Sequence, residues 1–458
     1  MPTTQHKKVF IETYGCQMNM YDTELIKSIL ISNQFGLTNE EKNADIVMLN
    51  TCSVRDNANR KIQNRVHEIK HANKNTLIGV LGCMATNFKT ELLENKSFPI
   101  DFIAGPDSYK TLPTLINSLI TSGQQQYDVT LSEFETYSDI NPTRQDGVNA
   151  WIAIMRGCNN FCTFCVVPYT RGRERSREPK NIVEEVKRLV NDGYKQVTLL
   201  GQNVNSYQYE QYDFTDLMKM VSDVEGIERI RYTSPHPKDY PVKLLHVMKE
   251  RDNICKQIHM PLQAGNDRVL HKMNRTYDKQ EFLDLVTQIK TIMPNIAIST
   301  DIIVGFPTET EEEFLDTYDV MQQVEFDSAF IFKYSERPNT RAAQKFPDDV
   351  TEADKKSRVI RLNDLQNSIG LKKNINLIHT TQNILVESLS TKKSTNEIQG
   401  RTDCNRIVIV PKDTQKLGET ISCLITDATR NVLKGTELKK QNHIKQSTLT
   451  KESVKVLS

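Results

Sequence analysis

The first third of the chain alternates short apolar runs with stretches in which apolar residues recur at helical spacing. Strand-like apolar runs occupy residues 8–13, 46–50, 77–81 and 102–104. Helical patterns follow the first two runs, over about 21–32 and 57–70. Alternating strands and helices are typical of a parallel sheet covered on both faces, so this region is predicted to form a doubly wound parallel α/β sheet.

The middle of the chain continues the same alternation over a longer stretch. Further apolar runs, with helix-like segments between them, lie at residues 151–155, 196–200, 229–233, 257–262, 297–304 and 329–333. Six parallel strands at this spacing predict a partial (βα)6 barrel, in which ligands bind at the carboxyl ends of the strands. A charged segment with helical spacing, residues 351–376, is expected to close the barrel.

The pattern changes again after residue 377. Short β-like runs separated by polar turns lie at residues 383–387, 400–402, 406–410, 419–426 and 431–435. They predict a small all-β barrel of the OB-like kind. The expected domains are therefore residues 1–145, 146–377 and 378–442, followed by a basic tail over 443–458 that is expected to be disordered.

Composition places the chain among soluble globular proteins. Its formal net charge is +1, so the overall field does not indicate a nucleic-acid binder and any such surface must be a local patch. The amino terminus lacks a signal-peptide core and no apolar run is long enough to span a membrane, so a cytoplasmic location is expected. In a reducing compartment the nine cysteines are expected to be metal ligands or buried thiols rather than disulfides.

Three cysteines lie close together just after the first strand of the predicted barrel. Cys158, Cys162 and Cys165, the loop triple, stand in a C-x3-C-x2-C spacing. Three thiolates can bind three irons of a cubane cluster and leave the fourth iron open for a ligand that is not protein. The alternative is zinc, which normally takes four ligands, and no fourth Cys or His follows nearby. The motif resembles the signature of the radical S-adenosylmethionine (SAM) superfamily, in which SAM binds the open iron.

A second set of three cysteines is spread over the first third of the chain. Cys16, Cys52 and Cys83, the strand-end triple, each lie just past one of the first three predicted strands. The carboxyl ends of parallel strands share one edge of a sheet, so these residues are expected to converge on a second metal site. The alternative is three unrelated buried thiols. The other cysteines lack partners at ligand spacing and are interpreted as structural: Cys255, Cys404 and Cys423.

Polar clusters also follow the strands of the predicted barrel, at residues 201–205, 234–236, 263–265 and 305–307. Each cluster alone is typical of an ordinary strand-to-helix turn. Together, on the rim that carries the loop triple, they predict a SAM pocket.

Taken together, these features resemble the methylthiotransferases, a subfamily of the radical SAM enzymes. The resemblance covers nearly the whole chain and rests on both cysteine triples and on the segments around residues 156–168 and 171–177. Residues 50–58, 154–162 and 200–207 are most similar to the branch that modifies N6-isopentenyladenosine at position 37 of tRNA. The other branches modify threonylcarbamoyladenosine in tRNA or an aspartate of a ribosomal protein. One departure is Ser234-Pro-His-Pro237, where the first branch more often reads Ser-His-Pro.

The resemblance implies two 4Fe–4S clusters with different tasks. The loop triple would hold the cluster that cleaves SAM, and the strand-end triple would hold an auxiliary cluster that supplies sulfur. One SAM would be the methyl donor, and a second would give the radical that abstracts hydrogen from carbon 2 of the adenine. No catalytic side chain beyond the cluster ligands is expected. The residues implied to contact SAM are Phe164, Gly201, Gln202, Asn203, Gln263 and Val304.

The resemblance also implies partners. The C-terminal region resembles the TRAM domain, an RNA-binding module, although a generic β-domain that stabilises the barrel is the alternative. The expected partners are the anticodon stem-loop of tRNA, an electron donor such as flavodoxin or ferredoxin, and sulfur-supply or Fe–S assembly proteins; a monomer is expected. Four arginines beside the loop triple are interpreted either as a solvated face or as contacts to tRNA phosphates: Arg171, Arg173, Arg175 and Arg177.

One hypothesis of a different class stays open at this point. A non-catalytic iron–sulfur protein that binds RNA as a redox sensor would need both clusters but no SAM pocket. Binding of SAM to the reconstituted protein separates this sensor from the enzyme.

Overall fold

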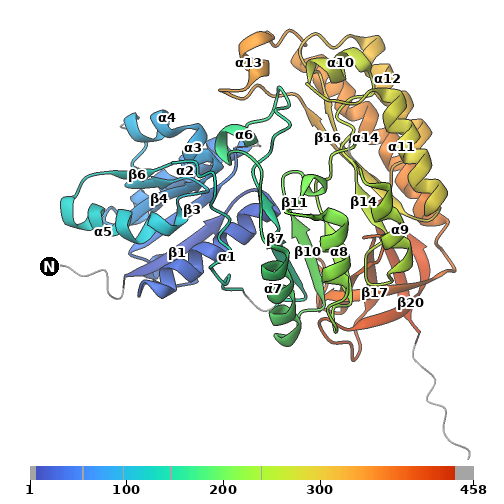
Figure 1. Cartoon of the computed structure of the whole chain (residues 1–458), viewed down its shortest axis with the longest axis horizontal. Coiled ribbons are helices and arrows are strands. Elements are labelled where there is room, and N and C mark those ends of the chain that lie inside the picture. The colour runs from blue at the N-terminus through green and yellow to red at the C-terminus, as the bar shows by residue number, and fades with distance from the viewer. Residues whose placement is uncertain (1–6, 54–55, 96, 145–146, 239, 439–458) are drawn as a thin grey trace, which may run out of the picture.

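The computed structural model describes residues 7–53, 56–95, 97–144, 147–238 and 240–438. Figure 1 shows an N-terminal α/β body in blue, a central barrel in green to orange, and a small β-barrel in red at one end of the central barrel. The predicted domain boundaries at 145/146 and 442/443, and the predicted tail, lie outside the described residues. Within those residues, every helix is too short or too polar to cross a lipid bilayer.

The N-terminal body is a six-stranded parallel sheet in the order β2-β1-β3-β4-β5-β6. Its strands are β1 (Lys8–Thr13), β2 (Gly36–Leu37), β3 (Ile46–Thr51), β4 (Leu77–Gly82), β5 (Phe102–Ala104) and β6 (Gln126–Asp128). All six residues of β3 are buried, as expected for a parallel strand covered on both faces.

Helices cover both faces of this sheet. Helices α1 (Gln17–Ser32) and α5 (Leu112–Ser122) pack on the face that carries Ile46 and Met48. Helices α2 (Asp56–Ala72), α3 (Cys83–Asn87) and α4 (Lys89–Glu94) pack on the face that carries Val47 and Leu49. The alternation along β3 confirms the predicted doubly wound sheet.

Six parallel strands form the central partial barrel, as two three-stranded sheets. One sheet has the order β13-β10-β7 and the other β14-β15-β16, and a single parallel bridge between Ile230 and Ile254 joins them. The strands are β7 (Asn149–Ala153), β10 (Gln196–Leu200), β13 (Arg229–Tyr232), β14 (Gln257–His259), β15 (Ala297–Val304) and β16 (Ser328–Lys333). β14 is shorter than predicted because Pro261 lacks the N–H that would continue the ladder.

Helices on the outside of the barrel complete its hydrophobic core. They are α7 (Pro179–Asn191), α8 (Phe214–Ser222), α9 (Val242–Glu250), α11 (Lys279–Ile292), α12 (Glu311–Val324) and α14 (Glu352–Ile375). Asp213, Asp278 and Thr310 form capping boxes that fix the starts of α8, α11 and α12. The helix predicted over residues 351–376 is α14.

Shorter elements decorate the barrel and the N-terminal body. They are the hairpin strands β8 (Met155–Arg156), β9 (Arg175–Ser176), β11 (Gln208–Tyr209) and β12 (Tyr212–Asp213), the helices α6 (Val167–Thr170), α10 (Asp267–Lys272) and α13 (Arg341–Lys345), and 3-10 turns at Glu41–Asn43, Tyr109–Thr111 and Val204–Ser206. Helix α6 and hairpin β8–β9 frame the loop triple.

The C-terminal body is a closed five-stranded barrel, as the sequence predicted. Its strands are β17 (Thr381–Ser388), β18 (Glu397–Thr402), β19 (Ile407–Pro411), β20 (Thr420–Ala428) and β21 (Val432–Glu437). Arg229 and Arg231 of β13 donate to backbone carbonyls of this barrel, including those of Arg401 at 2.6 Å and Thr402 at 2.8 Å. These contacts attach the small barrel to the amino end of the central barrel, away from α6 in Figure 1.

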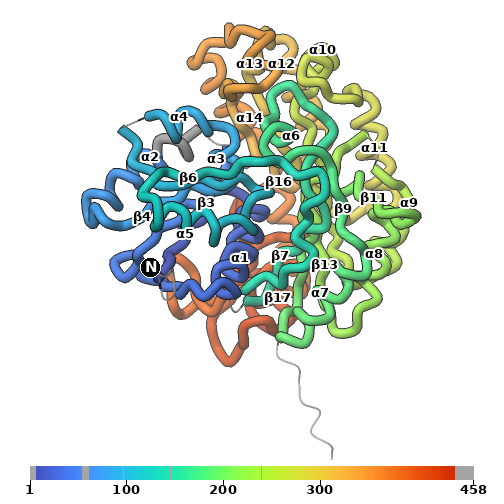
Figure 2. The backbone as a smooth tube through the Cα atoms, turned by 60° about the vertical axis from the view of Figure 1, so that its left-hand side comes forward, coloured from blue at the N-terminus to red at the C-terminus, as the bar shows by residue number. Residues whose placement is uncertain are grey.

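The N-terminal body packs against the first strands of the central barrel. Helix α1 lies against β7 (Figures 1 and 2). Trp151, Ala153 and Leu200 pack with the hydrophobic cluster of α1 and α5. The inner face of β7 and β10 is thereby covered by the N-terminal body.

Candidate functional site

The strand-end triple lies at the carboxyl edge of the N-terminal sheet. β1, β3 and β4 are neighbours in that sheet, and Cys16, Cys52 and Cys83 follow them closely along the chain. Cys16 is the N-cap of α1, and Cys83 is the first residue of α3. The topology therefore brings the predicted residues to one edge, as expected for an α/β sheet.

A glycine and a buried amide hold Cys16 beside Cys52. Gly15 has φ +128°, and a Cβ on it would lie 2.5 Å from the Cβ of Cys52, so only glycine fits between the two cysteines. Asn19 accepts a hydrogen bond from Cys16 Sγ at 3.3 Å and donates to the Thr51 carbonyl at 2.9 Å. The hydrogen bond with Cys52 lowers the pKa of Cys16 to about 6.

Cys83 contacts an arginine that comes from the central barrel. Arg171 Nε donates to Cys83 Sγ at 3.2 Å, and a second nitrogen of the same guanidinium pairs with Asp22 at 2.8 Å. Arg156 pairs with the other oxygen of Asp22 at 2.6 Å. Burial alone would raise the pKa of Asp22, but the two guanidinium groups hold it below its ordinary value. A buried ion-pair network therefore links the strand-end triple to the segment that carries the loop triple.

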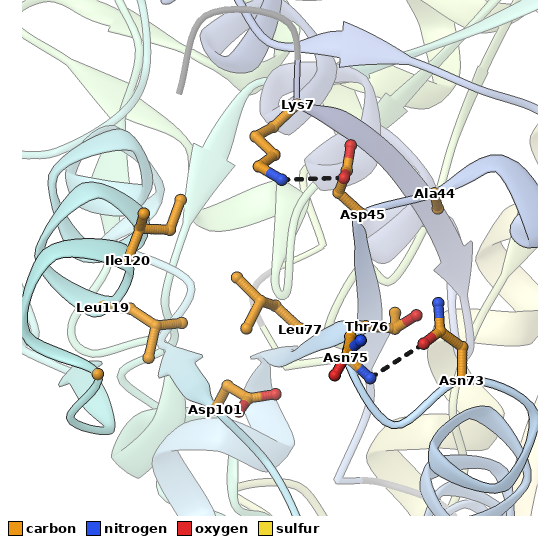
Figure 3. A pocket seen from close by; sticks show the side chains of 11 residues that line it. Lys7, Ala44, Asp45, Asn73, Asn75, Thr76, Leu77, Asp101, Leu119 and Ile120 are labelled. Atoms are coloured by element: carbon orange, nitrogen blue, oxygen red, sulfur yellow. Dashed lines mark hydrogen bonds and ion pairs between the residues drawn. The ribbon is translucent and has the colours of Figure 1, made fainter. Parts of the chain in front are cut away.

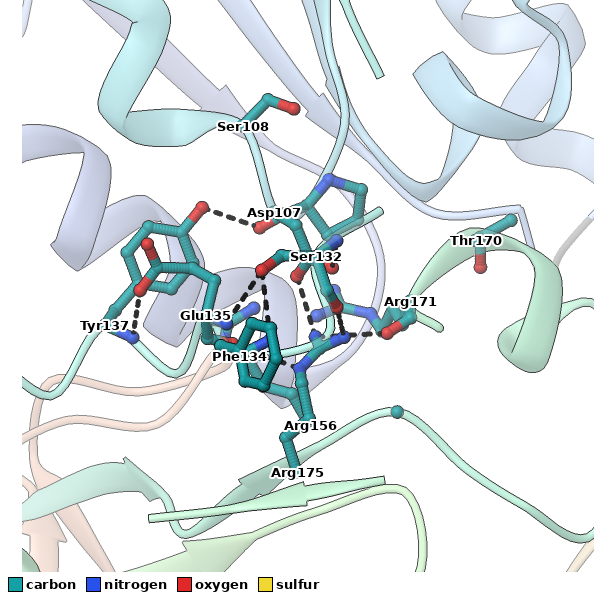
Figure 4. A network of polar contacts seen from close by, with 12 residues as sticks. Asp107, Ser108, Ser132, Phe134, Glu135, Tyr137, Arg156, Thr170, Arg171 and Arg175 are labelled. Carbon is teal, nitrogen blue, oxygen red and sulfur yellow. Dashed lines mark hydrogen bonds and ion pairs between the residues drawn. The ribbon is translucent and has the colours of Figure 1, made fainter. Parts of the chain in front are cut away.

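The arginine run after the loop triple is mostly buried, and both interpretations made from the sequence are wrong for three of its members. Arg171 pairs with Asp22, Arg177 pairs with Glu185, and Arg175 pairs with Asp107 at 2.9 Å. Figure 4 shows Arg156, Arg171 and Arg175 gathered beside the segment that carries Ser132, Glu135 and Tyr137. The exposed member is Arg173, whose guanidinium lies 4.4 Å from the ring centre of Phe161.

Backbone hydrogen bonds shape the loop triple. Cys158 N donates to the Gly172 carbonyl at 3.1 Å, and Gly157 N donates to Gln202 Oε1 at 2.6 Å. Gly157 has φ +79°, and a Cβ on it would lie 1.9 Å from the Arg173 carbonyl oxygen. The loop can therefore approach hairpin β8–β9 only with glycine before the first cysteine.

An arginine also contacts the loop triple. Arg275 donates to Cys162 Sγ at 3.2 Å, to the Tyr277 hydroxyl at 3.0 Å and to the Pro261 carbonyl at 3.4 Å. The Tyr277 hydroxyl in turn donates to the Leu262 carbonyl at 2.8 Å. Each cysteine triple thus has one arginine N–H on one of its sulfur atoms.

Burial sets the protonation of the other loop cysteines. It raises the pKa of Cys158 to about 11 and that of Cys165 to about 12. Both are therefore thiols at neutral pH without a ligand, and binding of iron must displace their protons.

The predicted SAM residues lie on the barrel rim in three different settings. Asn203 Oδ1 and Gln263 Oε1 are buried and have no hydrogen-bond partner among the described residues, so they can accept from a bound ligand. Gln202 instead supports the cysteine loop through Gly157. A Cβ on Gly201 would lie 2.7 Å from the Met155 side chain. Phe164 packs half-buried against the barrel core, and Val304 is fully buried in that core.

The segment after β16 reaches the strand-end triple. Asn339 donates to the Asn87 carbonyl of α3 at 3.3 Å. Burial lowers the pKa of Arg337, whereas its electrostatic interaction with Cys52 raises it, so Arg337 lies near that cysteine. The segment that follows the last strand of the barrel therefore passes close to the strand-end triple.

The donor chemistry of each triple fits an iron–sulfur cluster, because three thiolates can bind three irons of a cubane. Among the described residues, no three His, Cys, Asp or Glu side chains lie close enough to share one metal ion. An arginine N–H on one sulfur of each triple offsets part of the negative charge that three thiolates bring.

A cavity of about 460 Å³ lies away from both triples. Lys7, Asp45, Leu77 and Asp101 line it, at the amino ends of the N-terminal strands (Figure 3). The cysteines follow the carboxyl ends of the same sheet, so this cavity does not belong to the candidate site.

Sequence reasoning missed Asp22 and Arg275. The signal for Asp22 was an acidic residue beside Tyr21 and Leu25, on the buried side of α1. An acidic group there requires a buried cation. For Arg275 the sequence offered no local signal, because its contact to Cys162 joins residues 113 positions apart.

Comparisons with known families match most of the chain. Residues 152–321 match the radical SAM superfamily, residues 377–438 match the TRAM domain, and residues 8–105 match the uncharacterized protein family UPF0004.

Curated relatives match over nearly their whole length. The chain is 44% identical over 443 residues to the tRNA-2-methylthio-N(6)-dimethylallyladenosine synthase of Bacteroides fragilis, covering 94% of this chain and 96% of that protein. It is 45% identical over 439 residues to the protein of that name from Chloroherpeton thalassium, covering 95% and 97%.

Solved structures share the fold at low identity. The radical S-adenosylmethionine methyltransferase TsrM from Kitasatospora setae, with cobalamin and a [4Fe-4S] cluster bound, has a TM-score of 0.56 at 12% identity, covering 74% of each chain. Its complex with tryptophan and a SAM analogue has a TM-score of 0.57 at 13% identity, covering 74% of this chain and 75% of that one.

Proposed function

The chain belongs to the tRNA-2-methylthio-N(6)-dimethylallyladenosine synthases of the radical SAM superfamily, and we propose that its two cysteine triples divide that activity between them. The protein is a transferase that converts N6-isopentenyladenosine in tRNA to its 2-methylthio derivative and uses SAM and 4Fe–4S clusters. The observation that carries the residue assignment is the placing of one arginine N–H on a sulfur of each triple.

The loop triple holds the cluster that cleaves SAM, and the strand-end triple holds the auxiliary cluster. When bound, these groups would supply an electron for SAM cleavage at the first site and sulfur for transfer at the second. The chain's own residues provide the ligands, offset their charge and fix the distance between the two sites.

The arginines act on the two sites separately. Arg275 donates to Cys162, and Arg171 donates to Cys83 while it is tied to the buried Asp22. A positive charge beside a thiolate favours the deprotonated ligand that binds iron. Since Arg171 belongs to the segment after the loop triple, its hydrogen bond to Cys83 also fixes the position of one site relative to the other.

The SAM contacts are supported most strongly for two side chains. Asn203 Oδ1 and Gln263 Oε1 are buried acceptors without partners among the described residues, which suits the amino and hydroxyl donors of SAM. The Gln202 side chain accepts a hydrogen bond from Gly157 N, so Gln202 positions the loop triple, and its Oε1 already has a partner. Phe164, Gly201 and Val304 would contribute shape at the same rim.

The partners follow from the activity. The C-terminal TRAM barrel would bind the anticodon stem-loop of tRNA, and Arg173, the exposed member of the run, would contact its phosphates. A flavodoxin or ferredoxin would supply electrons, and sulfur-supply or Fe–S assembly proteins would restore the auxiliary sulfur. The enzyme would act in the cytoplasm as a monomer.

The test is an anaerobic assay of the reconstituted protein with SAM, a reductant and tRNA that bears isopentenyladenosine. The tRNA is digested and its nucleosides are measured by mass spectrometry. We expect a methylthio adduct on that nucleoside. Cleavage of SAM without the adduct, or no cleavage with both clusters verified as present, would overturn the function.

A further inference from the structure

The inner face of β14–β16 is open, in contrast to the covered inner face of β7 and β10. β15 and β16 pair in parallel, with Asp301 opposite Phe330 and Ile303 opposite Phe332, so these four side chains share one face. The alternate residues of β15, such as Ile302, are buried in the core that packs against the outer helices. The shared face is therefore the inner one.

Two aromatic side chains on this face are strongly exposed. Phe330 is 55% exposed and Phe332 is 45% exposed, although both stand on a strand inside the barrel. The His259 ring lies 6.0 Å from the Phe330 ring, and its Nε2 pairs with Asp301 Oδ2 at 3.0 Å. Exposed apolar residues gathered beside a fixed polar pair are typical of a ligand surface rather than of a solvated one.

Two chain segments lead from the aromatic face (Ile303, Phe330 and Phe332, edged by His259 and Asp301) to the two cysteine triples. The chain that follows β14 reaches the loop triple, because Arg275 contacts both the Pro261 carbonyl and Cys162.

The chain that follows β16 reaches the strand-end triple, through the contact of Asn339 with α3 and the interaction of Arg337 with Cys52. An adenine that is attacked from both sites must lie between them, so the substituent on its N6 lies against the surface that joins them.

We propose that the aromatic face binds the dimethylallyl group on N6 of the substrate adenosine; this specificity site rests on the proposed function. A branched apolar group complements the faces of Phe330 and Phe332 and the side chain of Ile303. The Asp301 carboxylate beside Phe330 disfavours an anionic substituent such as threonylcarbamoyl. The face therefore distinguishes this substrate from the other modified adenosine of tRNA.

The test measures binding of three anticodon stem-loop RNAs of one sequence that carry adenosine, isopentenyladenosine or threonylcarbamoyladenosine. Dissociation constants of the reconstituted full-length protein are read by fluorescence anisotropy at one fixed salt concentration. Wild type is expected to prefer the isopentenyl RNA over the unmodified RNA by about tenfold, the effect of burying part of a small apolar group. The Phe330→Ala/Phe332→Ala double variant is expected to lose most of this preference, and Phe332→Ala alone part of it.

The controls separate specificity from folding. Phe330→Leu/Phe332→Leu keeps an apolar face and is expected to retain much of the preference, and Leu315→Ala, at a similarly exposed position on α12, is expected to retain all of it. Thermal unfolding verifies that each variant is folded. An unchanged preference in the double alanine variant, or an equal loss of affinity for all three RNAs, overturns the specificity site. Wild type that forms no methylthio adduct overturns the proposed function instead.

Discussion

Arg171 joins the strand-end triple to the rest of the site, so its replacement by methionine tests how the chain controls the auxiliary cluster. Methionine keeps an unbranched apolar stem but removes the N–H on Cys83 and one of the two guanidinium partners of Asp22. Loss of a positive charge disfavours the reduced, more negative cluster. We expect the reduction potential of the auxiliary cluster to fall in Arg171→Met, while SAM cleavage persists.

The magnitude follows from the two contacts that are lost. A hydrogen bond to a charged group is worth about 1.5–3 kcal/mol. If this hydrogen bond stabilises the reduced cluster by roughly 1 kcal/mol more than the oxidised cluster, its loss lowers the reduction potential by roughly 40 mV. For a one-electron couple, 59 mV corresponds to about 1.4 kcal/mol. Asp22 keeps Arg156, so the loss of stability stays below the roughly 3–5 kcal/mol expected when a buried charge is left unpaired.

The assay is an anaerobic redox titration followed by electron paramagnetic resonance. It is made on protein in which Cys158→Ala removes the signal of the SAM-cleaving cluster. Arg173→Met is the matched control, because Arg173 belongs to the same run but is exposed and lies over Phe161. Arg275→Met, tested with the loop triple intact, is expected to shift the potential of the other cluster.

A potential in Arg171→Met that equals those of wild type and Arg173→Met would refute a role of Arg171 at the auxiliary cluster. The same conclusion would follow if Arg171→Met lost SAM cleavage but kept the auxiliary potential, since Arg171 would then act on the loop triple.

Two further predictions concern a buried carboxylate and a glycine. Burial alone would raise the pKa of Glu185, but Arg177 and Arg144 hold it below its ordinary value of 4.5. The ion pairs of Glu185 therefore stabilise the fold above that pH, and this stabilisation is lost as the pH falls. Glu185→Gln should therefore lower the free energy of unfolding by about 3 kcal/mol at pH 7 and by less at pH 4 in chemical denaturation; an equal loss at both would contradict the ion pair. In Gly157→Ala the new Cβ clashes with the Arg173 carbonyl, so the variant should lose the cluster of the loop triple, which is roughly half of the bound iron. Gly193→Ala, where no atom lies near the new Cβ, should keep its iron. Equal iron contents in the two variants would show that the close approach at Gly157 is unimportant.

The sequence predicted the sheets and barrels because strands and helices repeat at regular spacing and cysteines follow strand ends. Strands β2 and β6 were missed because they are only two and three residues long and lie at the two edges of the sheet. Helix α1 begins four residues earlier than predicted, because Cys16 rather than a typical polar residue is its N-cap.

The charged network was the part that local patterns could not reveal. The sequence left the arginine run open between solvent and RNA, whereas Arg171 is buried on Asp22, a residue 149 positions away. An ion pair of this kind depends on how the N-terminal body docks on the barrel, which periodicity does not specify. The exposure of Phe330 was not predicted either, because the pattern of residues along β16 does not distinguish an open face of a strand from a covered one.

We propose that the two cysteine triples do different work, and a comparison of Cys158→Ala with Cys83→Ala tests this division. Each variant is reconstituted anaerobically, and its iron content, SAM cleavage and methylthio product are measured on tRNA that bears isopentenyladenosine. We predict that Cys158→Ala keeps the auxiliary cluster but cleaves no SAM, and that Cys83→Ala cleaves SAM but inserts no sulfur. Cleavage of SAM by Cys158→Ala, or methylthio product from Cys83→Ala, would contradict the division.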